Sequence, residues 1–182
     1  MLAFVIVHLL GNLQAFAGPE AINGYAEKLR HLAPVLWAAR LFLVSMLVLH
    51  VWLAARLAWE NRRARPVRYA CEDTVQASFA SRTMMMSGLL VFVFVVYHLL
   101  HFTFRVTHPV FAQLVGAHGR PDVYAMMVLS FQERSLSSFY VLATGLLALH
   151  MSHAGWSMFQ TSGAIPARGF KLVQHMAGAR AR

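Results

Sequence analysis

The chain has 182 residues, of which 58% are hydrophobic and 13% charged, and its formal net charge is +9. This composition favours a single domain of membrane-spanning helices over a soluble globular core. The chain has one cysteine, Cys71, which excludes an internal disulfide and iron–sulfur or cysteine–zinc chemistry built from this chain alone.

Four apolar stretches follow one another along the chain. The first, 1–16, is too short to cross about 30 Å of hydrocarbon at about 1.5 Å per residue, so we expect a first span whose beginning is missing. The other three are long enough to cross, and they cover 34–59, 84–104 and 136–159. We therefore expect an all-α integral membrane helical bundle over residues 1–163, followed by a basic cytoplasmic tail over 164–182.

The segments between the spans differ in character. Ala21–Leu32 has its apolar residues on one side and predicts a short amphipathic helix at the outer surface. Thr107–Glu133 is interrupted by prolines and glycines, and we expect it to pack across the mouth of the bundle.

Basic residues gather on one side of the predicted bundle. They lie between the second and third spans and after the fourth: Arg62, Arg63, Arg65, Arg68, Arg82, Arg168, Lys171, Arg180 and Arg182. The positive-inside rule places both segments in the cytoplasm, so the C-terminus is expected inside. Because this distribution orients the protein in a lipid bilayer, we expect no nucleic-acid partner.

Each of the four apolar stretches carries a histidine: His8, His50, His98 and His150. An imidazole facing hydrocarbon is costly, so such a residue should have a partner or a function. Four spans with one histidine each supply the ligands of two bis-histidine metal centres, and haem is the cofactor most often held that way.

Residue counting sorts these histidines into two depths. His50 and His150 lie about 16 residues from the outer ends of their spans, and His8 and His98 about 8 residues from theirs, which separates the two levels by about 12 Å. We therefore expect two stacked b haems, an inner one held by His50 and His150 and an outer one held by His8 and His98.

Other histidines leave the assignment partly open. His101 and His153 each lie three residues from a candidate ligand, on a neighbouring part of the same helix face. Depth favours His98 and His150 as the ligands, which leaves His101 and His153 to bond haem propionates or to serve as polar residues of the bundle. The remaining histidines lie in loops and are expected to be solvated: His31, His108, His118 and His175.

Several stretches resemble one known family. His-Leu-Leu-Gly-Asn-Leu from His8 and Ile-Asn-Gly-Tyr-Ala from Ile22 resemble the first span and following loop of the cytochrome b subunit of succinate dehydrogenase and fumarate reductase. Tyr-His-Leu-Leu-His-Phe from Tyr97 resembles the third span of this two-haem, single-polypeptide membrane anchor, and His-Met-Ser-His-Ala-Gly-Trp-Ser-Met-Phe-Gln-Thr from His150 resembles the fourth. The similarity runs through most of residues 1–163.

The resemblance implies a function and partners. Members of the family carry one axial haem ligand on each of their first four spans, which fall here on His8, His50, His98 and His150. The chain is then expected to be a non-catalytic subunit that passes electrons between an iron–sulfur subunit and a membrane quinone. A flavoprotein subunit joins the iron–sulfur subunit on the cytoplasmic side of the bacterial inner membrane. The basic loop with Arg62, Arg63, Arg65 and Arg68 could be the docking surface for both, although membrane topology alone would also explain these residues.

The chain also departs from the family. Members have a complete first span and a fifth span, whereas 1–16 is short and 164–182 is polar and basic. We expect a fragment truncated at both ends, a misassigned reading frame or a reduced form.

A quinone site and two other functions are further hypotheses. Tyr25, His31 and Arg40 gather near the outer end and could hydrogen-bond a quinone carbonyl, although Arg40 could instead reach the interface or neutralise a haem propionate. The chain could be the dihaem anchor of another quinone-linked dehydrogenase. A histidine-lined transporter or metal channel, which would lack haem absorbance and peripheral subunits, belongs to a different class.

Overall fold

The computed structural model describes residues 1–64, 82–116 and 119–161, where the regular secondary structure is helical apart from one isolated β-bridge between Val115 and Pro121. Three helices are long and apolar enough to cross a membrane: Ala33–Ala64, Met84–Thr103 and Arg134–Ser152. The first apolar helix, Leu2–Ala17, is shorter. The prediction of an all-α membrane bundle is confirmed, whereas the expected tail at 164–182 lies outside the described residues.

The helices follow the predicted order, with one unexpected addition. The sequence predicts no helix in Thr107–Glu133, but this segment contains a ten-residue helix that begins where Asp122 accepts a hydrogen bond from the Ala125 N–H. The elements are α1 (Leu2–Asn12), η1 (Leu13–Ala17), α2 (Pro19–His31), α3 (Ala33–Ala64), α5 (Met84–His98), the π-helical turn η2 (Leu99–Thr103), η3 (Pro109–Gln113), α6 (Val123–Gln132) and α7 (Arg134–Thr161).

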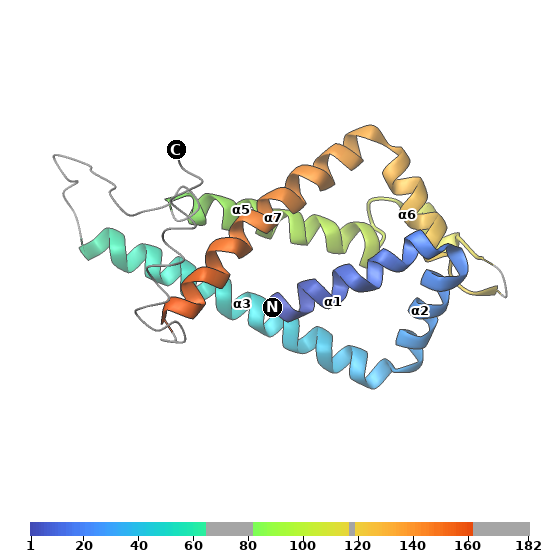
Figure 1. The fold of residues 1–182 in the computed structure, drawn as a ribbon, viewed down its shortest axis with the longest axis horizontal. Helices are drawn as coiled ribbons and strands as arrows, with labels where there is room; N and C mark the ends of the chain where they lie inside the picture. The colour runs from blue at the N-terminus through green and yellow to red at the C-terminus, as the bar shows by residue number, and fades with distance from the viewer. Residues whose placement is uncertain (65–81, 117–118, 162–182) are drawn as a thin grey trace, which may run out of the picture.

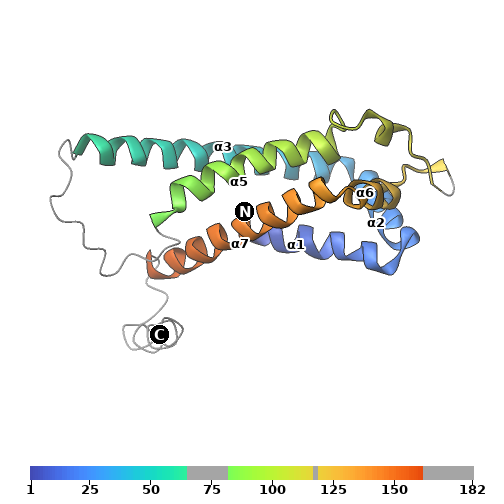
Figure 2. The ribbon, with the colours of Figure 1, turned by 90° about the horizontal axis from the view of Figure 1, so that it is seen from above.

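Two short helices close one end of the bundle. Figures 1 and 2 show α2 and α6 together at this end, with the longer helices running away from it. The turn into α2 is made by Gly18 with φ 98°, and Pro19 then occupies the first helical turn, where its missing N–H costs nothing. Since α3 follows α2 and α7 follows α6, both long helices start at this end, which we call the capped end.

Close packing is concentrated between α5 and α7. Phe94 of α5 is buried against Leu136, Tyr140 and Ala143 of α7, and this core is extended by partly buried aromatic rings. In contrast, α3 has no buried residue and α1 buries only Gly11. The bundle therefore consists of one tightly packed helix pair and two helices whose apolar surfaces remain available to lipid or to bound groups.

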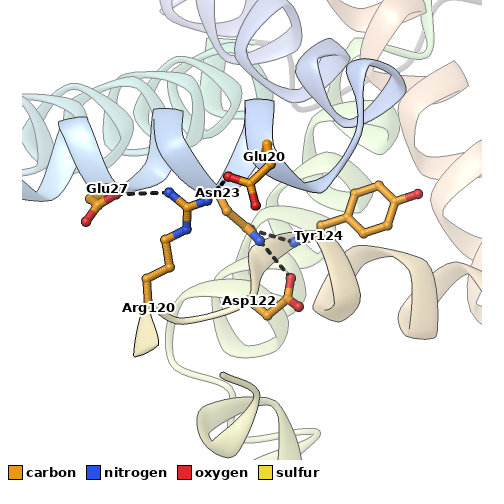
Figure 3. A network of polar contacts seen from close by, with 6 residues as sticks. All are labelled: Glu20, Asn23, Glu27, Arg120, Asp122 and Tyr124. Carbon is orange, nitrogen blue, oxygen red and sulfur yellow. Dashed lines mark hydrogen bonds and ion pairs between the residues drawn. The ribbon is translucent and has the colours of Figure 1, made fainter. Parts of the chain in front are cut away.

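The capped end is held together by polar contacts between α2 and the segment before α6 (Figure 3). Asn23 of α2 is only 3% exposed; its amide nitrogen donates to Asp122 at 2.9 Å and its amide oxygen accepts from the backbone N–H of Tyr124 at 3.0 Å. Asp122 also caps α6 by accepting from the backbone N–H of Ala125 at 2.9 Å. One buried amide thus ties two helices together through bonds that use both of its polar atoms.

An ion-pair cluster lies beside this amide. The Arg120 guanidinium donates to Glu20 and to Glu27, which are seven residues apart on the same face of α2. Hydrogen bonds to these two carboxylates, with Glu20 the larger cause, raise the pKa of Arg120 above its ordinary value. Glu20 remains 70% exposed, so we attribute the main hold on α2 to the buried Asn23 rather than to this cluster.

Replacing Asn23 with Ala should destabilise the capped end. The Asp122 carboxylate and the Tyr124 N–H would both lose a partner in a partly buried site, which typically costs about 1–3 kcal/mol of unfolding free energy. Thermal unfolding in detergent measures the loss, with the exposed Lys28→Ala on the same helix as control. Equal unfolding midpoints for the two variants would contradict the role given to Asn23.

Acid should weaken the same connection. Hydrogen bonds from the Ala125 backbone and then from the Asn23 amide hold the pKa of Asp122 below its ordinary value. The stabilisation is therefore present above the ordinary carboxyl pKa of about 4 and is lost as the pH falls through the lower folded value. The thermal unfolding midpoint, measured at successively lower pH from about 7, should decrease once the pH is below about 4. The decrease should be less steep in Asp122→Asn. An equally steep fall in that variant would assign the acid sensitivity to other groups.

Candidate cofactor site

The four predicted ligands come from four different helices and meet in two pairs. His8 of α1 lies beside His98 of α5, with ring centroids 5.8 Å apart and planes at 85°. His50 of α3 lies beside His150 of α7, with centroids 6.3 Å apart and planes at 88°. Each pair joins one helix of the tightly packed α5–α7 pair to one of the two loosely packed helices.

The two pairs lie at different depths. The segments α1–η1 and α5–η2 both run toward the capped end. His8 lies nine residues before the end of η1, and His98 lies five residues before the end of η2. His50 and His150 lie 17 and 16 residues after the starts of α3 and α7, which begin at that end. At about 1.5 Å per residue, the His50–His150 pair is more than about 10 Å farther from the capped end.

The spacing within each pair suits a metal ion held between two imidazoles. Metal–nitrogen bonds of about 2 Å, with about 1 Å from each nitrogen to its ring centre, put two axial rings about 6 Å apart. The described part of the chain contains no group of three or more histidine, cysteine, aspartate or glutamate side chains that could hold a metal. Two imidazoles at this spacing form a donor set for a cofactor that needs two protein ligands per metal, as haem does.

His98 lies in an aromatic enclosure. The rings of Phe94, Phe102 and Tyr140 have centroids 5.9, 5.5 and 6.1 Å from its own. Its Nδ1 atom is buried and has no hydrogen-bond partner in the described residues. A buried imidazole nitrogen without a partner is costly, and a group bound at that nitrogen itself would remove the cost.

His8 has a more open setting. Its ring stacks on Phe4 one turn earlier, with centroids 5.3 Å apart, and its Nε2 atom lies 3.2 Å from the side-chain amide nitrogen of Asn12. Since that amide nitrogen is a donor, Nε2 of His8 acts as the acceptor and carries the lone pair that a metal requires.

His150 is held by the opposite helix. Its Nδ1 atom lies 3.2 Å from the Ser87 hydroxyl oxygen of α5. A Cβ atom on Gly88 would stand only 3.2 Å from Cε1 of the same ring, so the glycine allows this close approach. A hydrogen bond at Nδ1 fixes ring orientation and directs metal binding to Nε2, the arrangement usual for histidine ligands.

His101 is fully buried and has both ring nitrogens bonded. Ser130 of α6 donates to the Met126 carbonyl at 2.6 Å and therefore accepts from Nε2 of His101 at 3.2 Å. This assigns the proton to Nε2, and Nδ1 accepts from the Tyr140 hydroxyl at 2.9 Å. In this arrangement His101 has no free lone pair for a metal and serves as the polar junction of η2, α6 and α7.

The π-helical turn η2 explains how His98 and His101 face different partners. In an α-helix three residues turn about 300°, which would leave both rings near one face. The wider turn after His98 rotates His101 away toward Ser130. His108, expected to be solvated, is half-buried, and its ring centroid lies 5.0 Å from those of His101 and Phe111, stacked on the latter.

The three residues predicted for a quinone site have separate surroundings. The Tyr25 ring packs over Gly11 of α1, where a Cβ atom would come within 3.0 Å of it. Arg40 lies over the Trp37 ring at 5.1 Å, and His31 is exposed at the end of α2. In the residues that the structure describes, no hydrogen bond or ring contact joins these three side chains.

Sequence reasoning missed Ser87, Gly88, Ser130 and Tyr140. Each lies within or next to an apolar stretch, and only the fold brings it to a histidine; the one local signal is a hydroxyl or glycine in hydrocarbon. Other predicted features lie outside the described residues: the side chain of His153, and all of Arg65, Arg68, Cys71, His118 and His175.

Comparisons of the chain with models of protein families, with curated proteins and with solved structures found no match.

Replacing Tyr140 with Phe should destabilise the protein by about 1–3 kcal/mol, because the fully buried Nδ1 of His101 would lose its partner. Tyr97→Phe is the matched control, since the described structure gives its hydroxyl no hydrogen bond, and it should change stability by less than about 0.5 kcal/mol. Thermal unfolding in detergent compares the two; equal losses would contradict the buried junction.

Proposed function

We propose that this chain is the membrane-anchor cytochrome b subunit of a succinate dehydrogenase or fumarate reductase complex. It would be a non-catalytic subunit with two b haems that passes electrons between an iron–sulfur subunit and a membrane quinone. The observation that carries the proposal is the pair of histidine contacts, 5.8 and 6.3 Å between ring centroids, at two depths of one helical bundle. The resemblance of the stretches that begin at His8, Tyr97 and His150 to that family supports the choice of complex.

Four histidines of the chain would bind the two haem irons. His8 and His98 are the axial ligands near the capped end, and His50 and His150 are those farther from it. When bound, two b haems supply one-electron oxidation and reduction. The aromatic rings around His98 keep water away from that ligand, and the Ser87 hydroxyl orients His150.

The loose packing of α1 and α3 is compatible with bound planar groups. The helices α1 and α3 bring His8 and His50 to the bundle but bury almost nothing against α5 and α7. Macrocycles held between these helices would bury apolar surface that side chains leave exposed, and would join the loose helices to the tight pair.

The topology proposed from the charge pattern puts the capped end on the outer face of a bacterial inner membrane. The opposite end of α3 then reaches the cytoplasm, where Arg62 and Arg63 are exposed and Arg63 lies over the Trp59 ring at 4.8 Å. We propose this end as the docking surface for the flavoprotein and iron–sulfur subunits. Quinone would bind toward the capped end, with Tyr25, His31 and Arg40 as candidates that would have to move together around it.

Reduced-minus-oxidised spectra of the purified protein test the assignment. The wild type should show b-type bands with two redox components and should carry the two peripheral subunits through purification. His50→Ala and His150→Ala should each remove the same component, and His8→Ala and His98→Ala the other, because each haem needs both axial rings. His31→Ala, at an exposed position outside the four ligands, is the control for haem content.

Three results would contradict the proposal. A wild-type protein without b-type bands would remove the haem assignment and favour a histidine-lined transporter or metal channel. If His50→Ala and His98→Ala removed the same redox component and kept the other, the pairing would be contradicted. Haem with different peripheral subunits would indicate the anchor of another quinone-linked dehydrogenase.

A further inference from the structure

Arg105, just past η2 at the capped end, has an unusual backbone conformation. Its φ of 57° makes it the only residue other than glycine with a positive φ in the described ranges. The Phe104 N–H bonds to the Leu99 carbonyl at 2.8 Å and the Val106 N–H to the Leu100 carbonyl at 2.9 Å, so Arg105 occupies the left-handed position that ends the helix. Glycine or asparagine is usual at such a position, because a larger side chain is strained there.

The side chain of Arg105 adds a second observation. Its Nε atom is buried and has no hydrogen-bond partner among the described residues. A cation near a helix C-terminus is favourable in itself, but that attraction needs neither a left-handed backbone nor a buried nitrogen. Arg120 also has an unbonded buried Nε, but its guanidinium is paired with two carboxylates. In Arg105 the strained backbone and the unbonded donor occur together and call for an explanation, which an anion bound to the guanidinium would supply.

The chain's own described carboxylates have other partners. Glu20 and Glu27 pair with Arg120, and Glu60 pairs with Arg56. Asp122 bonds Asn23 and the start of α6, and Glu133 accepts from the Ser135 hydroxyl at 2.7 Å. Within the described residues, then, no carboxylate is paired with Arg105.

The position of Arg105 indicates which anion it would bind. It follows His98 by seven residues, just past the π-helical turn, on the capped side of the outer histidine pair. We propose that Arg105 pairs with a propionate carboxylate of the haem held by His8 and His98. A guanidinium is suited to this task because its N–H groups match both oxygens of a carboxylate. This assignment rests on the proposed function, since the carboxylate belongs to that cofactor.

Arg105→Asn is the informative variant. Asparagine tolerates the left-handed backbone, so the substitution removes the guanidinium without new strain. Arg105→Lys keeps the positive charge, and Arg30→Gln changes an exposed arginine of α2 whose only described bond is to the Ala26 carbonyl. The full chain is purified in detergent with the subunits it retains. Redox titration then identifies the outer component as the one that His98→Ala removes, and capture on apomyoglobin measures haem release.

Loss of the guanidinium should act on the outer centre alone. In Arg105→Asn the outer midpoint potential should fall, because a nearby cation favours the more electron-rich reduced state, and haem release from that site should be about tenfold faster. Arg105→Lys should recover part of both changes, and Arg30→Gln should match the wild type. The inner component should keep its potential in all three variants.

The opposing outcomes are distinguishable. A haem-free wild type would overturn the proposed function and this pairing together. Two haems with an unchanged outer potential and release rate in Arg105→Asn would overturn the pairing and leave the proposed function standing. A difference between wild type and Arg105→Asn that arises only after phosphatidylglycerol is added to delipidated protein would assign Arg105 to a lipid phosphate instead, which also overturns the pairing.

Discussion

The cost of leaving an imidazole without a partner in hydrocarbon constrains this bundle more than any other interaction. His101 meets the constraint within the protein, with both ring nitrogens bonded by Tyr140 and Ser130. His98 does not, since its buried Nδ1 has no partner among the described residues, and its ring instead faces His8. The contrast between these two histidines of the same span separates a structural residue from a candidate ligand.

The uneven packing of the three long helices and of the shorter α1 follows from the same division. The helices α5 and α7 form a core with α6 across its end, and there the polar side chains of His101, Tyr140 and Ser130 hydrogen-bond one another. By contrast, α1 and α3 bury almost nothing, and their His8 and His50 rings lie beside those of His98 and His150. Bound macrocycles would complete both the polar and the apolar contacts, so the proposed cofactor would be a structural part of the bundle as well as its electron carrier.

Much of this fold could be predicted from local sequence, because the spans are long apolar runs and their order is simple. Residue counting placed His8 level with His98 and His50 level with His150, and the rings of these pairs are neighbours in the structure; iron binding stays a prediction. The π-helical turn, the strained backbone of Arg105 and the helix α6 could not be predicted. The contacts that position His101 and Asn23, with Ser130 and with Asp122, join distant segments, and no local pattern encodes them.

The ratio of haem b to polypeptide in the purified protein tests the central claim most directly. Two histidine pairs, each able to hold one iron, predict two haems per chain. A ratio of two would support the account of α1 and α3 as helices joined to the core through cofactors. A ratio of zero would contradict it entirely, and a ratio of one would show that at least one of the two ring pairs is only a packing contact.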